Sequence, residues 1–172
     1  MKIGDKLMNK KAQQTMGMPF SVIFSIILIV VFLVVAGIVV KHFLDLQKCS
    51  EISIFLKGLQ DDVDKVWQSS AREETFAAGL PSAIKEVCFT NFTEALTNNK
   101  YSDVKIRYGF YNPNFFFYPP EKACEIPYYT IKHINITNMI TGNNPYCIKN
   151  ENNPKIKISK GFYESLVRIE KA

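Results

Sequence analysis

An uncharged and strongly apolar run near the N-terminus is the feature that most limits what this chain can fold into. From Gln13 to Val40 there are 28 consecutive residues without Asp, Glu, Lys, Arg or His, in a chain of 172 residues. A domain of this size has no core large enough to bury such a run. A helix from Phe20 to Val40 would be about 31 Å long at about 1.5 Å per residue, which matches one hydrocarbon thickness. The sequence therefore predicts one transmembrane helix over residues 19–41.

The lysines around this run predict its orientation. Residues 1–12 carry four Lys against one Asp, whereas residues 41–172 are nearly balanced, with 17 Lys and Arg against 15 Asp and Glu. Positive residues favour the cytoplasmic side, so we expect residues 1–18 to be a basic cytoplasmic segment and the rest to lie outside the cell membrane. Val39-Val40-Lys41-His42 does not resemble a signal-peptide cleavage site, which favours an uncleaved signal anchor. The balanced outer part also lacks the basic face that nucleic-acid binding requires.

The residues before the span resemble a known processing site. Lys10-Lys11-Ala12-Gln13-Gln14-Thr15 is similar to the cleavage site of archaeal pilin-like precursors, which carry a class III signal peptide. The resemblance implies a cut between Ala12 and Gln13, with Thr15 in the hydroxyl position, and a subunit made of a long helix and a globular head. Gly17 stands where family members usually carry Glu. The Met-Pro-Phe opening of the span also resembles single-pass membrane-anchored proteins of small archaea, and no activity comes with that likeness.

A second helical pattern follows over residues 42–68, which we call the stalk helix. Its apolar side chains recur every three or four residues, at Cys49, Ile52, Leu56, Leu59, Val63 and Val66. Asp61, Asp62 and Asp64 fall on the opposite face. Because no Pro or Gly separates His42 from Lys57, the span and the stalk can form one helix of about 50 residues, as in a pilin-like subunit. The stripe is too short to define a coiled coil, and a helix packed on its own domain is the favoured interpretation.

The periodicity shortens to two within residues 69–172, which predicts a β-rich head. Residues 69–82 hold turn-forming residues and are expected to be a connector. Alternating apolar residues predict strands around Val104–Phe110, Ile134–Ile136, Ile156–Ile158 and Val167–Ile169. Residues 82–97 fit either a strand or a short helix capped by Ser82. The expected fold is α+β: a long transmembrane and stalk helix followed by a small antiparallel, disulfide-bonded extracytoplasmic domain.

Four cysteines lie in the part of the chain that is predicted to be outside: Cys49, Cys88, Cys124 and Cys147. The gaps between them are 39, 36 and 23 residues, so the close ligand spacing of structural zinc sites is absent. An even number of cysteines in an oxidising compartment predicts two disulfides. Three pairings are open, and we favour Cys49–Cys88 together with Cys124–Cys147. The alternative is four buried thiols in a protein whose C-terminus lies inside.

Two triplets in the head fit the rule for N-glycosylation. They are Asn91-Phe92-Thr93 and Asn135-Ile136-Thr137, and neither has Pro in the middle. If the head is outside the cytoplasm, Asn91 and Asn135 are therefore candidates for modification. Such triplets also arise by chance in Asn-rich chains, so a bare surface Asn is the alternative.

An aromatic run between residues 108 and 120 is a candidate interaction patch, centred on Phe115, Phe116, Phe117 and Tyr118. Alternation along a strand buries only about half of such side chains on one sheet face, so some could remain exposed. A hairpin covered on both faces is the alternative, and burial is favoured because aromatic residues dominate small cores.

The residue types needed for catalysis are sparse. The two histidines, His42 and His133, lie at the membrane border and on a predicted strand, and no glycine-rich phosphate loop occurs. Residues 61–64 lie on a helix face, whereas an oxygen-ligand cation loop needs a turn glycine and a later Glu. We therefore expect no catalytic residue, no metal and no cofactor.

The function predicted from these features is a noncatalytic structural or interaction role for a single-pass membrane protein. Its expected partners are the lipid bilayer and either copies of itself or other envelope proteins, and not nucleic acid. An accessory subunit of a membrane protein complex is the alternative. An envelope enzyme ranks third, and a polar cleft holding His133 beside a carboxylate would favour it.

Overall fold

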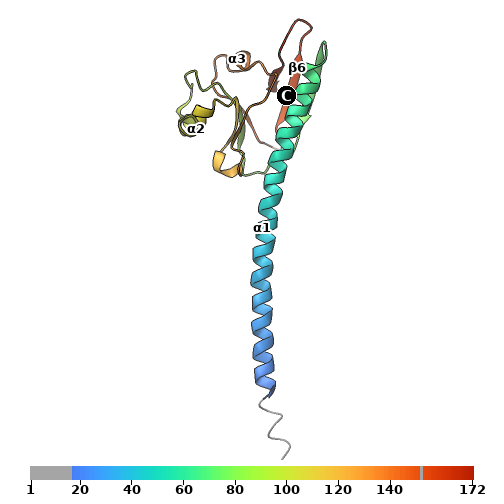
Figure 1. Ribbon diagram of the computed structural model, residues 1–172, viewed down its shortest axis with the longest axis vertical. Coiled ribbons are helices and arrows are strands. Elements are labelled where there is room, and N and C mark those ends of the chain that lie inside the picture. The colour runs from blue at the N-terminus through green and yellow to red at the C-terminus, as the bar shows by residue number, and fades with distance from the viewer. Residues whose placement is uncertain (1–16, 152) are drawn as a thin grey trace, which may run out of the picture. The chain divides into compact units, whose positions relative to one another are not determined.

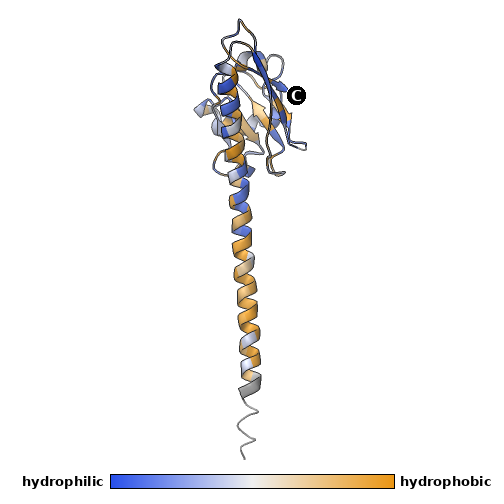
Figure 2. Ribbon diagram, turned by 90° about the vertical axis from the view of Figure 1, so that its right-hand side faces the viewer, coloured by the Kyte–Doolittle hydropathy of each residue, from blue (hydrophilic) through white to orange (hydrophobic). Residues whose placement is uncertain are grey.

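The computed structural model describes residues 17–151 and 153–172 of the chain. The chain divides into two compact units, the first ending at Asp45 and the second comprising Leu46–Ala172, which we call the head. One helix, α1 (Gly17–Trp67), begins in the first unit and ends in the second. Its apolar and uncharged residues are followed by alternating polar and apolar ones in the head (Figure 2).

In the first unit the polar residues of α1 do not interrupt the helix. Ser25 donates its hydroxyl to the carbonyl oxygen of Ser21 at 2.8 Å, so that a polar side chain is satisfied by the helix itself. Every side chain from Phe20 to Asp45 is exposed. Within the described residues, α1 is the one helix that is long and apolar enough to cross a bilayer.

Within the head, α1 buries the apolar stripe predicted for the stalk helix. Ile52, Phe55, Leu59, Val63 and Val66 are fully buried, and the amphipathic pattern is confirmed. The helix ends at Trp67, where the ammonium group of Lys160 donates to the carbonyl oxygens of Trp67 at 2.6 Å and Ser69 at 3.1 Å. A cation at this end satisfies unpaired carbonyls and complements the helix dipole.

Two antiparallel sheets complete the head, as the sequence predicted for an α+β fold (Figure 1). A three-stranded sheet has the order β1-β6-β7, and a four-stranded sheet has the order β4-β3-β2-β5. The bounds of the remaining helices and strands, in chain order, are β1 Arg72–Ala77, β2 Glu86–Phe89, α2 Ser102–Tyr108, β3 Phe115–Tyr118, β4 Tyr128–Tyr129, α3 Ile136–Met139, β5 Tyr146–Lys149, β6 Lys155–Lys160 and β7 Arg168–Lys171. Short 3-10 helices cover Asn99–Tyr101, Gly109–Tyr111 and Pro120–Lys122.

The main core lies where α1 meets both sheets. Phe55 of α1 makes edge-to-face contacts with Phe76 of β1 and Phe117 of β3, with ring centroids 5.2 and 6.0 Å apart. A smaller core lies on the other face of the four-stranded sheet and contains Cys88, Phe92, Tyr101, Val104 and Phe116. The four-stranded sheet is therefore covered on both faces.

The strand predictions hold at the C-terminal end of the chain and fail closer to the middle. Ile156 and Ile158 lie in β6 and Ile169 lies in β7, as predicted. The segment from 82 to 97 contains a strand, β2, rather than a capped helix. The predicted connector at 69–82 contains β1, which pairs with β6 along its whole length. β1 was missed because Phe76 is its only buried residue, so that its sequence lacks apolar alternation.

The predicted strand over 104–110 is wrong, because residues 102–108 form α2. Alternation would bury Ile106 and Phe110, yet these side chains are 82% and 94% exposed. The residues that face the smaller core are Tyr101 and Val104, three apart, with Tyr108 four residues further on. This spacing is helical, and the same residues also fit the alternating pattern that predicted a strand.

The predicted strand at 134–136 is also wrong. Ile134 makes one isolated bridge to Val167, and Ile136 begins α3. His133, which was expected on that strand, has a positive φ of 65°. Since a β-strand requires negative φ, the chain turns at His133 instead of extending through it.

The four cysteines form two disulfides, as predicted, but the favoured pairing is wrong. Cys49 is bonded to Cys124 and Cys88 is bonded to Cys147. Cys88 in β2 lies directly opposite Cys147 in β5 in the antiparallel register, so these two residues are cross-strand neighbours. The other bond joins α1 to the loop that follows β3. The strand order, which the sequence does not reveal, decides which cysteines meet.

Candidate functional site

The candidate patch at Phe115, Phe116, Phe117 and Tyr118 is not a surface, and burial, which was the favoured interpretation, is confirmed. These residues form β3, and the three phenylalanines are fully buried while Tyr118 is half-buried. Phe115 and Phe117 belong to the main core, whereas Phe116 belongs to the smaller core. All three phenylalanines can be buried because both faces of the four-stranded sheet are covered.

A different group of aromatic side chains lies next to α2, in which Phe110 and Tyr111 are exposed and Tyr108 and Tyr128 are half-buried. Tyr108, Phe110, Tyr111 and Tyr128 contact one another, and we call these four residues the aromatic surface. The ring of Tyr111 stacks on Tyr128 at 5.2 Å between centroids, and Tyr108 lies 5.1 Å from Tyr128. Phe110 meets Tyr111 edge to face at 5.8 Å. The aromatic surface therefore joins α2 and the following 3-10 helix to β4.

Local backbone geometry explains why Phe110 points outward. The 3-10 helix Gly109–Tyr111 continues α2 and ends at Asn112, which adopts the left-handed conformation with φ 47°. Val104 occupies the buried side of α2, so Phe110 extends from the opposite side and is 94% exposed. Burying a side chain of this size is worth about 1.5–3 kcal/mol, and at 94% exposure Phe110 gains little of that from the described residues. Exposed aromatic groups of this kind are typical of surfaces that contact a partner.

A second exposed aromatic pair lies in the loop between β6 and β7. Phe162 is 70% exposed and Tyr163 is 96% exposed, and their rings meet edge to face at 5.1 Å. The loop is held at its base by Glu164, whose carboxylate accepts a hydrogen bond from the backbone N–H of Gly161 at 2.6 Å. The predicted aromatic run of residues 108–120 includes Phe110 and Tyr111 but was centred on residues 115–118, and sequence reasoning missed the pair Phe162 and Tyr163. The helical spacing of Tyr101, Val104 and Tyr108 is the signal that would have indicated the outward direction of Phe110.

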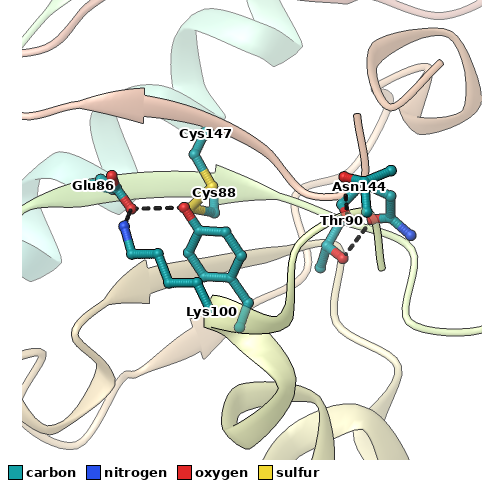
Figure 3. The surroundings of a disulfide bond; sticks show 8 residues. Glu86, Cys88, Thr90, Lys100, Asn144 and Cys147 are labelled. Carbon is teal, nitrogen blue, oxygen red and sulfur yellow. Dashed lines mark hydrogen bonds and ion pairs between the residues drawn. A yellow bond between two sulfur atoms is a disulfide. The ribbon is translucent and has the colours of Figure 1, made fainter. Parts of the chain in front are cut away.

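A polar cluster surrounds the Cys88–Cys147 disulfide (Figure 3). Glu86 of β2 accepts hydrogen bonds from the ammonium group of Lys100 at 2.6 Å and from the hydroxyl of Tyr101 at 2.8 Å. The ammonium group also lies 5.0 Å from the ring centroid of Tyr101. Burial disfavours the charged form of Lys100, but the hydrogen bonds to Glu86 and Tyr101 outweigh this and raise the pKa of Lys100. Burial, followed by the hydrogen bond to Glu86, raises the pKa of Tyr101.

This cluster has the residue types of a metal site but not their free ligand atoms. Glu86, Cys88 and Cys147 place one oxygen and two sulfur atoms within 4.8 Å of one another. Both sulfur atoms are in the disulfide, whereas a metal is bound by thiolate. The carboxylate of Glu86 is already bonded to Lys100 and Tyr101. The arrangement ties β2 to the segment before α2.

His133 lies beside a carboxylate, as an envelope enzyme would require. Its Nδ1 is 3.0 Å from Oδ1 of Asp64, and its ring stacks on Trp67 with centroids 3.7 Å apart. Gln60 donates to the same carboxylate oxygen at 2.7 Å. The hollow next to Asp64 is lined by Asp61, Asp64, Lys65, Gln68, Ser69 and Arg72, and His133 is not part of it. Within residues 17–151 and 153–172 no hydroxyl is bonded to the imidazole, so the pair lacks a nucleophile in hydrogen-bond contact.

The predicted modification and processing sites have different settings. Asn91 lies in the turn after β2, and Asn135 caps α3 through its side-chain oxygen. The predicted processing site at Ala12 and Gln13 lies outside the described residues.

The chain was compared with known proteins at three levels. No protein-family model, no curated protein and no solved structure matches the chain.

Proposed function

We propose that this protein is a single-pass membrane protein, with its N-terminus in the cytoplasm and its disulfide-bonded head outside. The head would have a noncatalytic structural or interaction role. The observation that carries this proposal is the uninterrupted helix from Phe20 to Val40, whose side chains are all exposed. In water such a surface is strongly unfavourable, whereas a bilayer solvates it and the helix satisfies its own backbone hydrogen bonds. Two disulfides in the head agree with an oxidising compartment.

Protease accessibility tests the orientation. Protease added to intact cells should digest the head and leave a fragment that contains residues 20–40. Inverted membrane vesicles should protect the head under the same conditions. Digestion of the head only in the inverted vesicles would show that the orientation is reversed and would refute the proposal.

The finer version of the proposal is a pilin-like subunit. The resemblance around Ala12 and Gln13 supports it, and so does a helix that continues from the apolar run into the head. Mass analysis of the mature N-terminus from the native membrane tests this version. A chain that begins at Gln13 is expected, and one that begins at Met1 or Lys2 would leave a simple signal anchor.

An accessory subunit of a membrane complex is the second candidate, and Gly37 favours it. Apart from its chain neighbours and the backbone of α1 itself, no atom of the described residues lies within 4 Å of the position that a Cβ would take at Gly37. Another helix could therefore approach the backbone closely there. Purification in mild detergent separates the candidates, because an accessory subunit would retain a different protein at fixed stoichiometry.

Within an interaction role, we assign partner contact to the aromatic surface. Phe110→Ser should reduce recovery of the copurifying copy or partner without unfolding the head, because Phe110 makes few contacts of its own chain. Phe162→Ser is the matched control, since Phe162 is also an exposed phenylalanine on the head. Equal recovery from the Phe110→Ser variant and the unsubstituted chain would exclude the aromatic surface as the contact.

A further inference from the structure

We propose that Asn91, and not Asn135, carries an N-linked glycan on the folded head. This inference rests on the proposed extracytoplasmic position of the head. The two triplets are equivalent as sequence motifs, and the structure places them in different backbone conformations.

At Asn91 the acceptor triplet is already folded onto itself. The side-chain oxygen Oδ1 of Asn91 accepts hydrogen bonds from the backbone N–H of Thr93 at 3.1 Å and from the hydroxyl of Thr93 at 2.7 Å. The side-chain nitrogen Nδ2 donates to the carboxylate of Glu94 at 3.0 Å in an exposed setting. The hydroxyl that the motif requires is therefore next to the amide that would be modified.

The backbone of Asn91 is held by the buried Asn144, whereas its side chain bonds to Thr93 and Glu94 in an exposed setting. Buried Asn144 donates from Nδ2 to the carbonyl oxygen of Asn91 at 2.8 Å, and its Oδ1 accepts from the N–H of Asn91 at 3.3 Å. Phe92, the middle residue of the triplet, is buried and stacks on Phe116 at 5.8 Å. The backbone of the turn is thus fixed by Asn144 and Phe92, and the nitrogen Nδ2 of Asn91 is bonded only to the exposed carboxylate of Glu94 among the described residues. An enzyme could reach Nδ2 by displacing Glu94, without unfolding the head.

Asn135 has the opposite arrangement. Its Oδ1 accepts from the N–H of Asn138 at 3.2 Å and so caps α3, while its own N–H donates to the carbonyl oxygen of Val167 at 2.8 Å. Thr137 lies inside α3, and its hydroxyl has no hydrogen bond to Asn135. The neighbouring side chains of Ile134 and Ile136 are buried in or packed against the main core. Bringing Thr137 onto Asn135 would require α3 to unwind and these contacts to break.

The chemistry of glycan transfer fits the contacts at Asn91. Nδ2 forms a bond to the anomeric carbon of a polyprenyl-linked sugar donor, the bond from that carbon to the phosphate oxygen breaks, and the polyprenyl phosphate or diphosphate leaves with the electron pair. The amide gives up one proton to a base of the transferase, and no atom is oxidised or reduced. As Nδ2 loses its proton, negative charge develops on Oδ1, where the N–H and O–H of Thr93 already donate. Donors aimed at developing charge lower the barrier to such a step.

The modification of both sites can be measured by mass spectrometry of one tryptic digest of the protein isolated from its native membrane. Asn91 falls in the peptide of residues 86–100 and Asn135 in the peptide of residues 133–149. The first peptide contains Cys88 and the second contains Cys147, so the disulfide joins them until the sample is reduced. In the reduced digest we expect a glycan mass on the first peptide and none on the second.

Variants test whether the modification requires Asn91 and the hydroxyl of Thr93. The glycan mass should be lost completely from Asn91→Gln and Thr93→Val, and it should persist in Thr93→Ser, which keeps the hydroxyl. Asn135→Gln is the matched control and should leave the glycan in place. A glycan on the Asn135 peptide, alone or together with Asn91, would overturn the choice of site.

The same digest distinguishes failure of this inference from failure of the proposed function. If both peptides are bare while they are joined by the disulfide and protease on intact cells reaches the head, glycosylation is refuted and the topology stands. If both are bare, the thiols are free and the head is protected in intact cells, the topology and the glycan are refuted together.

Discussion

Asn144 offers the sharpest test of how the head is held together, because one buried amide joins three segments. Its side chain is 3% exposed, and its Oδ1 accepts from the hydroxyl of Thr90 at 2.9 Å (Figure 3). Its Nδ2 donates to the carbonyl oxygens of Asn91 at 2.8 Å and Ala95 at 3.2 Å. Asn144→Asp keeps the size of this side chain and the oxygen Oδ1 that accepts from Thr90 and Asn91, but it replaces the nitrogen Nδ2 that donates both hydrogen bonds. The substitution therefore isolates the contribution of the two donated hydrogen bonds.

The expected loss follows from the two carbonyl oxygens that lose a donor. The carbonyl oxygen of Asn91 keeps a hydrogen bond from the backbone N–H of Glu94 at 3.2 Å, so the larger loss falls on Ala95. An unsatisfied group in a buried setting costs about 1–3 kcal/mol. We expect the free energy of unfolding to fall by about 2 kcal/mol or more at pH 7, since the new carboxylate also faces the two carbonyl oxygens. Burial and the two carbonyls raise the pKa of the introduced carboxyl above its unfolded value of about 3.9. The loss should therefore be smallest below pH 4, where the carboxyl is protonated in both states, and grow as the pH rises through the folded-state pKa.

The measurement is urea denaturation of the full chain in detergent micelles with both disulfides intact, followed by the fluorescence of Trp67, which is the one tryptophan in the chain. Asn143→Asp is the matched control, because the adjacent Asn143 is exposed and undergoes the same change of charge. A loss at pH 7 below about 0.5 kcal/mol, or one equal to that of the control, would refute the assignment, since surface substitutions normally change stability by no more than that.

Three further outcomes are expected. Replacing Cys49 and Cys124 by Ser should lower the free energy of unfolding by about 4 kcal/mol in urea denaturation, because the bond closes a loop with a sequence separation of 75; an unchanged urea midpoint would contradict this. Burial, followed by the charge of Glu74, raises the pKa of Asp62 in the folded state. Asp62→Asn should therefore raise the urea midpoint at pH 7 and have no effect below pH 4, where Asp62 is protonated in both the folded and the unfolded chain. A gain of equal size at both pH values would exclude this cause. Val104→Ala should cost about 1–3 kcal/mol of unfolding free energy because Val104 is fully buried, whereas Ile106→Ala should change it by less than about 0.5 kcal/mol; equal losses would be evidence against α2.

The parts of the fold that the sequence predicted are those in which one face is buried and the other faces solvent. The stalk pattern from Ile52 to Val66 and the alternation of Ile156 and Ile158 each have a polar opposite face, so the period of the apolar residues indicates the element. β1 lacks this contrast because Phe76 is its only buried side chain, and its presence depends on pairing with β6. Local sequence does not carry information about that partner.

The candidate site was predicted less well, for a related reason. A run of aromatic residues indicates burial or exposure only when the number of covered faces is known, and β3 is covered on both. The cysteine pairing failed in the same way, because the order β4-β3-β2-β5 brings Cys147 next to Cys88, 59 residues earlier in the chain. The side-chain contacts of Asn91 and Asn135 depend on Asn144 and α3, and they likewise could not be predicted from two triplets that fit the same motif.

The aromatic residues of the head fall into two groups, one that stabilises the fold and one that fits the proposed interaction role. Phe115, Phe116 and Phe117 fill both cores from a single strand, so each of the two layers around the four-stranded sheet depends on β3. Phe110 and Tyr111, only a few residues earlier, contribute to neither core. Their removal should leave folding intact, so selection for stability alone does not explain their aromatic side chains. A partner that covers the aromatic surface does explain them, and this is why the Phe110→Ser variant should lose the partner and keep the fold.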